Sequence, residues 1–123
     1  MGLEAVTQQN DYKANPDAFV YLKVDRNMQK IIVNDILYIE SRKDYAKLYF
    51  SNGKSLLVKQ SITTMQNLLS EYKFLRIHRS YIVSLGKVSG YSALSVHLDS
   101  REVPIGRMYK QAVVKALTEP QEQ

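Results

Sequence analysis

The sequence predicts a mainly β domain, built from antiparallel sheets and carrying two short helices. Apolar residues alternate with polar ones in many short runs, which is the pattern of strands with one buried face. Turn-forming residues separate these runs, and the Asn52-Gly53 pair between two of them is typical of a tight β-hairpin. Strands and helices do not alternate in the manner of parallel sheets, so we expect antiparallel pairing.

Five strands are expected in the first half of the domain. Each run ends at a cluster of charged or small polar residues that favours a turn. Between residues 19 and 58 the runs read, in order, FVYLKV, KIIV, LYIES, YAKLYF and SLLV. The expected core draws on these strands and on later ones, with the members Tyr38, Ile39, Leu48, Phe50, Phe74, Leu75 and Ile77.

A helix is expected next, because the apolar spacing changes to three and four residues. The apolar positions that share its face are Ile62, Met65, Leu68 and Leu69. Ser61 stands immediately before them and is a suitable N-cap. The helix should extend for about ten residues and end near Tyr72.

Strand patterns resume after this helix, and a second helix follows them. The runs are FLRIH, SYIV, KVSGY, LSVHL and EVPI. The C-terminal helix should pack one apolar face, made of Met108, Ala112, Val113, Ala116 and Leu117. Pro120 should end it.

One arginine interrupts the strand pattern of the segment FLRIHRSYIVS. As a continuous strand, this segment would place Leu75, Ile77, Tyr81 and Val83 on one apolar face. Arg79 would lie on the same face, where an unpaired guanidinium costs several kcal/mol of desolvation. Either a buried partner pairs with Arg79, or the strand breaks near His78 and Arg79 points outward. We expect the His78 imidazole to cap the backbone of the following turn, and His97 to be a solvated strand residue.

The charge and composition of the chain bound its function. Residues 1–18 read as a flexible linker or tail, residues 19–118 as the folded domain, and residues 119–123 as a C-terminal tail. Residues 1–19 and 119–123 each carry a net charge of −2, which leaves +9 for residues 20–118 out of the total of +5. Such a surplus favours polyanionic partners, nucleic acid before membrane.

Several other classes of protein are disfavoured. There is no cysteine, the two histidines are nineteen residues apart, and no apolar run is long enough to span a membrane. Ser80, His78 and Asp99 do not form a recognisable catalytic constellation. We therefore expect no enzymatic activity, no cofactor, no metal site and a cytoplasmic location.

Three turns carry basic residues that are harder than the others to explain as ordinary solvent-exposed residues. They are Arg42-Lys43-Asp44-Tyr45, Arg79-Ser80, and Gly106-Arg107 with Lys110 one turn further on. If they gather on one edge, they form a positive surface suited to duplex DNA, because the planar arginine fork can bind guanine bidentately. Alternatively, they are three solvated turns that point in unrelated directions.

The order of these motifs resembles the LytTR-type DNA-binding domain of bacterial response regulators. The resemblance covers residues 19–117 and is carried by the segments ILYIESRKDYAKLYF, FLRIHRSYIVSL and VPIGRMYKQAV. It implies an elongated stack of small antiparallel sheets whose loops enter successive major grooves of double-stranded promoter DNA. Ser84 and Gly106 depart from the asparagine and serine that are usual in the family.

Carried over by position, the resemblance implies that the loop from Arg42 to Tyr45, Arg79 and Arg107 read bases. Lys43, Lys87 and Lys110 would then neutralise phosphates. Members commonly carry a phospho-acceptor receiver domain, and we expect this chain to be an effector domain excised from such a protein or a stand-alone relative. The resemblance also implies binding to direct repeats with weak self-association on DNA.

Two other functions remain as alternatives to the binding of duplex DNA. One is a small β-barrel that binds single-stranded nucleic acid through stacked tyrosines. The other is an interaction module whose exposed strand edge accepts a peptide.

Overall fold

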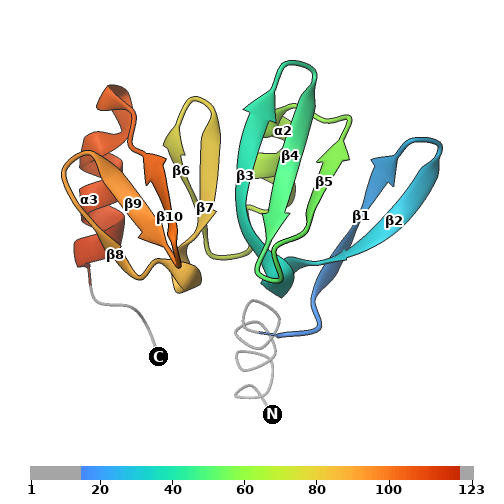
Figure 1. Cartoon of the computed structure of the whole chain (residues 1–123), viewed down its shortest axis with the longest axis horizontal. Coiled ribbons are helices and arrows are strands. Elements are labelled where there is room, and N and C mark those ends of the chain that lie inside the picture. The colour runs from blue at the N-terminus through green and yellow to red at the C-terminus, as the bar shows by residue number, and fades with distance from the viewer. Residues whose placement is uncertain (1–14, 120–123) are drawn as a thin grey trace, which may run out of the picture.

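The computed structural model describes residues 15–119, which fold into three antiparallel sheets and two α-helices (Figure 1). The two-stranded sheet pairs β1 (Phe19–Val24) with β2 (Asn27–Ile32). The five-stranded sheet has the order β5-β4-β3-β7-β6, and its strands are β3 (Ile36–Arg42), β4 (Tyr45–Phe50), β5 (Ser55–Val58), β6 (Phe74–His78) and β7 (Tyr81–Ser84). The three-stranded sheet has the order β10-β9-β8, with β8 (Gly90–Tyr91), β9 (Ser95–Leu98) and β10 (Arg101–Pro104).

The three sheets follow one another along the long axis of the molecule (Figure 1). The β1–β2 hairpin lies at one end, the five-stranded sheet in the middle, and the three-stranded sheet with α3 (Lys110–Thr118) at the other end. The remaining helix, α2 (Ile62–Leu68), packs on the five-stranded sheet. The predicted fold class, an elongated stack of small antiparallel sheets with two short helices, is confirmed.

Strand β3 is the centre of the fold, because it is buried on both faces. Its first four residues are all buried, whereas a strand at a half-solvated position shows only alternate burial. Ile39 faces a core shared with α2 and the β1–β2 hairpin, and Tyr38 faces a second core shared with the three-stranded sheet and α3. Truncating a fully buried isoleucine such as Ile39 to alanine typically costs about 2–5 kcal/mol.

The expected core residues lie in these two clusters. Tyr38, Ile39, Leu48 and Ile77 are buried, and Phe50, Phe74 and Leu75 pack against them while partly exposed. The described residues thus form two hydrophobic layers, one on each face of the five-stranded sheet.

Helix α2 begins where the sequence predicts but ends earlier. Ser61 is its N-cap, and the Ser61 side chain accepts a hydrogen bond from the Thr64 backbone N–H at 3.0 Å. The helix stops at Leu68 instead of continuing to Tyr72. Leu69 is the C-cap residue of this short helix, and its side chain is buried in the core.

The C-terminal segment differs from the predicted pattern in its phase. A 3₁₀-helix, η3 (Arg107–Tyr109), precedes α3, and the Met108 side chain is 90% exposed rather than packed. Helical spacing placed Met108 on the face of Val113, but the tighter 3₁₀ turn rotates it away. Val113 is fully buried and Leu117 packs on the same core. The predicted strand KVSGY is reduced to the two residues of β8.

The predicted termini fall largely outside the described residues. Of the expected linker over residues 1–18, the structure describes 15–18, and of the expected tail it describes only Glu119. Neither α-helix within residues 15–119 is long and apolar enough to cross a membrane.

Candidate nucleic-acid interface

The three basic turns lie along one edge of the molecule (Figure 1). Two main-chain hydrogen bonds join them. The Ser41 N–H donates to the Ser80 carbonyl at 2.8 Å, which ties the end of β3 to the β6–β7 turn. The Gly106 N–H donates to the Ile77 carbonyl at 2.8 Å, which ties the β10–α3 connection to the end of β6. The backbone therefore fixes the spacing of the three turns relative to one another.

Arg79 lies at the turn of the β6–β7 hairpin, where the strand breaks. Leu75 pairs with Val83 and His78 with Tyr81, with a shift in register between them. The two residues Arg79 and Ser80 form the connection, so Arg79 leaves the apolar face and is exposed. Of the two alternatives raised by the sequence, the structure shows the broken strand.

The backbone of the Arg79 turn is held by side chains on both sides. The His78 Nδ1 accepts a hydrogen bond from the Ser80 N–H at 3.0 Å. The Arg76 guanidinium donates through Nε to the His78 carbonyl at 2.8 Å and through Nη2 to the Arg79 carbonyl at 2.5 Å. Its third contact, Nη1 to Gln66 Oε1 at 2.8 Å, anchors it to α2. Arg76 is not among the residues that the sequence predicts for the site.

The β3–β4 turn is organised differently, because here the arginine head group is held. Arg42 pairs with Tyr45 across the hairpin, and Lys43 adopts a left-handed backbone with φ 58°. This conformation costs a non-glycine residue about 1–2 kcal/mol. The Arg42 Nη1 lies 3.3 Å from Glu40 Oε1 and donates a hydrogen bond to it. Lys43 and Asp44 are exposed at the tip of the turn.

Glu40 is also the acceptor for two tyrosines. The Tyr49 hydroxyl donates to Oε1 at 2.8 Å and the Tyr81 hydroxyl donates to Oε2 at 3.2 Å. Burial, together with the adjacent Glu40 carboxylate, raises the pKa of Tyr49 to about 12 and raises the pKa of Tyr81 in the same direction. Tyr38 stacks on Tyr49 with ring centroids 4.3 Å apart. These three rings are engaged inside the fold, so they are poorly placed to stack on the bases of a single strand.

The β10–α3 connection brings Arg107 and Lys110 to the same edge, and both are exposed. Gly106 packs closely at this point. A Cβ on it would lie 3.0 Å from Tyr109 Cδ1 and 3.4 Å from His78 Cα. A serine at this position would have to shift the Tyr109 ring, so glycine allows the connection to approach β6 closely.

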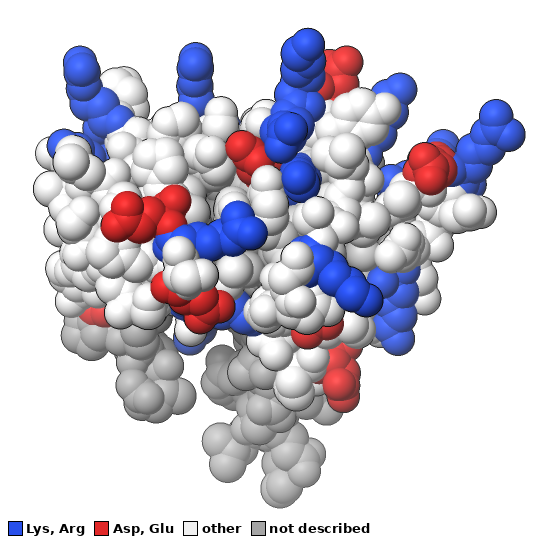
Figure 2. Space-filling view, viewed as in Figure 1, with Lys and Arg blue, Asp and Glu red and all other residues white. Residues whose placement is uncertain are grey.

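The edge is strongly positive in the space-filling view. Figure 2 shows Lys and Arg side chains projecting in a row above the β10–α3 connection, the β6–β7 turn and the β3–β4 turn. Among residues 15–119, neither Arg79 nor Arg107 has a carboxylate within the 4.0 Å of an ion pair. Their charges are consequently available to an external anion.

The opposite edge is where Lys87 lies, contrary to the phosphate-binding role expected of it. Lys87 belongs to η2 (Leu85–Lys87), which follows the end of β7 distant from the Arg79 turn. Its Nζ donates a hydrogen bond to the Asn34 carbonyl. Lys87 therefore joins two segments of the fold and is not part of the basic edge.

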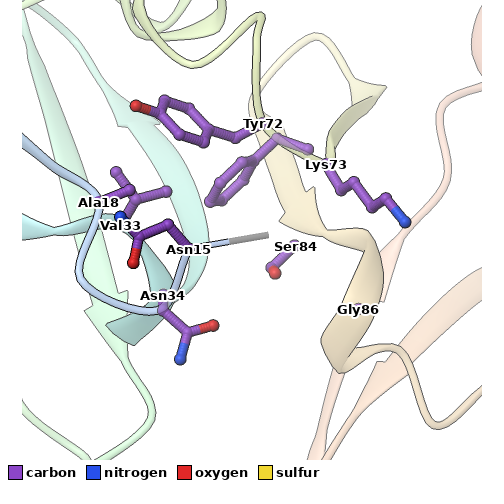
Figure 3. Close-up of a pocket in the computed structure, with 9 residues that line it drawn as sticks. Asn15, Ala18, Val33, Asn34, Tyr72, Lys73, Ser84 and Gly86 are labelled. Atoms are coloured by element: carbon purple, nitrogen blue, oxygen red, sulfur yellow. The ribbon is translucent and has the colours of Figure 1, made fainter. Parts of the chain in front are cut away.

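A pocket of about 200 Å³ also lies at this opposite edge, near the starts of β3 and β6. Figure 3 shows Asn15, Val33 and Tyr72 around it, with Lys73 and Ser84 on its other side. Its lining contains no histidine or carboxylate, and its titratable side chains are those of Tyr72 and Lys73.

Metal binding finds no support in the described part of the chain. No group of three or more histidine or carboxylate side chains there could hold an ion. His97 Nε2 instead lies 3.1 Å from Glu102 Oε2 on the neighbouring strand, a pairing that the sequence did not predict.

Comparison with known proteins defines the class of this fold as a LytTr DNA-binding domain. Residues 26–118 match the model of the LytTr DNA-binding domain family. The chain belongs to this family, as the resemblance implied.

Two similar proteins agree with this assignment. The chain is 28% identical over 102 residues to an uncharacterized response regulatory protein of Vibrio cholerae, a match that covers 75% of this chain and 39% of that protein. It superimposes with a TM-score of 0.67 and 20% identity on the LytTr DNA-binding domain of a Bacillus cereus protein described as a methyl-accepting/DNA response regulator. That match covers 82% of this chain and 97% of the solved domain, and it shows a shared fold.

Proposed function

We propose that this domain binds double-stranded promoter DNA sequence-specifically, through its basic edge, as the effector domain of a transcriptional response regulator. The observation that carries the proposal is the location of the three basic turns on one edge, joined by the hydrogen bonds Ser41–Ser80 and Gly106–Ile77. A duplex approached from one side presents phosphates and base edges along a line, which a row of turns can follow.

The exposed residues of the edge divide into two roles. Arg79 and Arg107 are unpaired by carboxylates among the described residues and are assigned to base edges, where an arginine fork can bind guanine O6 and N7. The loop from Arg42 to Tyr45 joins them in base reading, because Asp44 can accept a hydrogen bond from the cytosine amino group. Lys43 and Lys110 are assigned to phosphates, and Ser80 to a DNA contact of its turn, while His78 supports the loop by accepting a hydrogen bond from the Ser80 N–H.

The spacing of the turns favours a bent duplex. Strands of a sheet lie about 4.8 Å apart, so the centres of the β3–β4 and β6–β7 turns are separated by about 10 Å. Successive major grooves of straight B-DNA are about 34 Å apart. Long side chains and the β10–α3 connection extend the reach, and bending of the DNA toward the protein, at about 1–6 kcal/mol, would reduce the remaining mismatch.

In a longer protein, we propose that a receiver domain controls this binding. Phosphorylation of that domain would raise the population of dimers, and two copies of the present domain would then occupy direct repeats side by side. Alone, the domain should associate only weakly with itself on DNA.

The proposal can be tested by selecting DNA from random duplexes in a mobility-shift assay. The same selection recovers the binding site. The selected duplex should be preferred over either of its single strands. With about six phosphate contacts, the log-log dependence of affinity on salt should have a slope near −5. Equal affinity for the single strands would favour the single-strand rival, and an affinity independent of salt would favour the peptide-binding rival.

A further inference from the structure

We infer that the DNA-binding edge continues beyond the β3–β4 turn, through Lys59, to the β1–β2 turn, where Arg26 binds the phosphate backbone beside the base-read site. This inference rests on the proposed function and extends it to a surface that none of the three basic turns contains. The partner is the flanking duplex, recognised by its phosphate charge rather than by its sequence.

The position of Lys59 follows from the register of the five-stranded sheet. Ala46 pairs with Val58 in the antiparallel β4–β5 pair, and Tyr45 precedes Ala46 at the edge that carries the β3–β4 turn. Lys59 follows Val58 directly, so it emerges at that same edge, one strand further along. The structure shows Lys59 exposed.

The position of the Arg26 turn follows from the other end of its hairpin. The open end of the β1–β2 hairpin is closed by a hydrogen bond from the Val33 N–H to the Ala18 carbonyl at 2.9 Å and leads directly to the start of β3. The start of β3 lies at the edge opposite the basic turns. The hairpin turn, which joins Val24 to Asn27, therefore points toward the basic edge, as Figure 1 shows.

The charge at this turn is available for binding. Arg26 is exposed, and among residues 15–119 no carboxylate lies within 4.0 Å of its guanidinium. Figure 2 shows basic side chains projecting at the tip of the hairpin, in continuation of the row above the five-stranded sheet. Asp25, the other residue of the turn, adopts a left-handed backbone with φ 57°.

Phosphate, rather than a base edge, is the ligand that suits this turn. The three base-reading turns are joined by main-chain hydrogen bonds, whereas the β1–β2 hairpin is a separate sheet that contacts β5 through packing. Bidentate base contacts need exact placement of the side chain, while a phosphate contact tolerates small shifts because it is dominated by charge.

The test uses the full chain, the selected duplex and the double variant Arg26→Ala/Lys59→Ala. One duplex carries about one helical turn of flanking DNA on both sides of the selected site, and two others are trimmed, each on one side. On the long duplex, the double variant should bind several-fold more weakly than the parent, and its salt slope should be smaller in magnitude by about 2, since each lost phosphate contact removes about 0.9. The same loss should appear on a long duplex of scrambled sequence.

Trimming provides the internal control. On one of the two trimmed duplexes, the parent and the double variant should bind equally, because the phosphates that Arg26 and Lys59 contact are gone. Lys54 lies at the opposite edge, in the β4–β5 turn, and is not expected to contact DNA. Lys54→Ala therefore removes a cation without removing a phosphate contact, and its salt slope should equal that of the parent. Thermal melting should show all variants folded, since the substituted side chains are exposed.

Failure of the inference and failure of the proposed function give different results. If the double variant keeps the parent's affinity and salt slope on the long duplex, the extension through Lys59 to Arg26 is wrong and the three-turn interface stands. If the parent itself fails to prefer duplex over single strands, the proposed function is wrong and the extension falls with it.

Discussion

The β6–β7 turn and the β3–β4 turn present arginines at the same edge, yet the structure restrains them in opposite ways. At the β6–β7 turn the backbone is held by Arg76 and His78, while the head group of Arg79 has no carboxylate partner among the described residues. At the β3–β4 turn the head group of Arg42 is held by Glu40, and the tip residue Lys43 occupies a strained backbone conformation.

A basic residue in a turn is therefore not by itself a DNA contact. A guanidinium on a fixed backbone is ready to bind, because the backbone of the turn loses little further conformational entropy and no intramolecular ion pair has to be broken. A guanidinium already bonded to a carboxylate must first exchange that partner. We therefore expect the two turns to contribute unequally to binding.

The largest effect should come from replacing Arg76, which holds the backbone of the β6–β7 turn, and it should appear in the free energy of unfolding. Arg76→Ala removes two hydrogen bonds to main-chain carbonyls and one to Gln66. Charged hydrogen bonds contribute about 1.5–3 kcal/mol each, and water will replace part of this, so the free energy of unfolding should fall by about 2–3 kcal/mol. Chemical denaturation measures this change.

Binding by the Arg76 variants separates support of the turn from general stability. Arg76→Ala should also lower the affinity for the selected duplex, because the turn that carries Arg79 loses its support. Arg76→Lys keeps the charge but cannot bridge both carbonyls, so it should recover less than half of that loss. The β6–β7 turn would not depend on Arg76 if Arg76→Ala kept both the stability and the sequence preference of the parent.

Arg79→Ala should have the next largest effect, and on binding alone. Loss of one base contact costs about 1–3 kcal/mol at the selected site, which is roughly 5-fold to 150-fold in affinity. Binding to scrambled duplex should change much less, and so should the unfolding free energy, because the side chain is exposed. Arg107→Ala should behave in the same way. Lys54→Ala is the matched control for lost charge, and a folded Arg79 variant that bound like this control would refute the assignment.

A smaller effect is expected at the β3–β4 turn. Arg42→Ala should weaken specific binding by less than about 1 kcal/mol, since the guanidinium must leave Glu40 before it contacts DNA. Glu40→Gln should do the opposite and tighten binding a few-fold, because it frees Arg42 and adds one positive charge to the domain. Titration of both variants against the selected duplex measures the difference, and a larger loss for Arg42→Ala than for Arg79→Ala would reverse the comparison.

The smallest effect concerns pH, and it tests the Glu40 cluster itself. Burial and Glu40 raise the pKa of Tyr49 from 10.0 to about 12. The raised pKa means that the neutral phenol is favoured in the folded state, so its contribution to stability is complete below pH 10 and is lost as the pH rises from 10 to 12. Ultraviolet titration of the parent and of Tyr49→Phe isolates this tyrosine. A Tyr49 that ionised near pH 10 in the folded protein would show that the contact with Glu40 is not maintained in solution.

Much of this arrangement could be predicted from local sequence patterns. The period-two alternation identifies the strands, Ser61 marks the start of α2, and the position of Arg79 on an otherwise apolar face indicates the break at His78. The pairing of Arg42 with Glu40 could also be predicted from the sequence, because residues two apart on a strand share a face.

The rest depends on contacts that are distant in the sequence. The three turns share an edge because of the hydrogen bonds Ser41–Ser80 and Gly106–Ile77, and no local pattern specifies those partners. In the sequence, Arg76 cannot be told from an ordinary solvated strand residue. Its role depends on its hydrogen bonds to the His78 and Arg79 carbonyls, which form only when the turn folds. Lys87 is basic and lies in a turn, as the true edge residues do, but the strand that precedes it runs toward the opposite edge.

Titration of the isotope-labelled chain with the selected duplex, followed by backbone amide chemical shifts, tests most directly whether one edge binds DNA. We predict that the largest shifts fall in residues 42–45, 79–80 and 106–110, while the amide signals of residues 51–54 and 85–87 at the opposite edge stay near their positions in the free protein. Shifts concentrated at the opposite edge, or scattered over both edges, would contradict it.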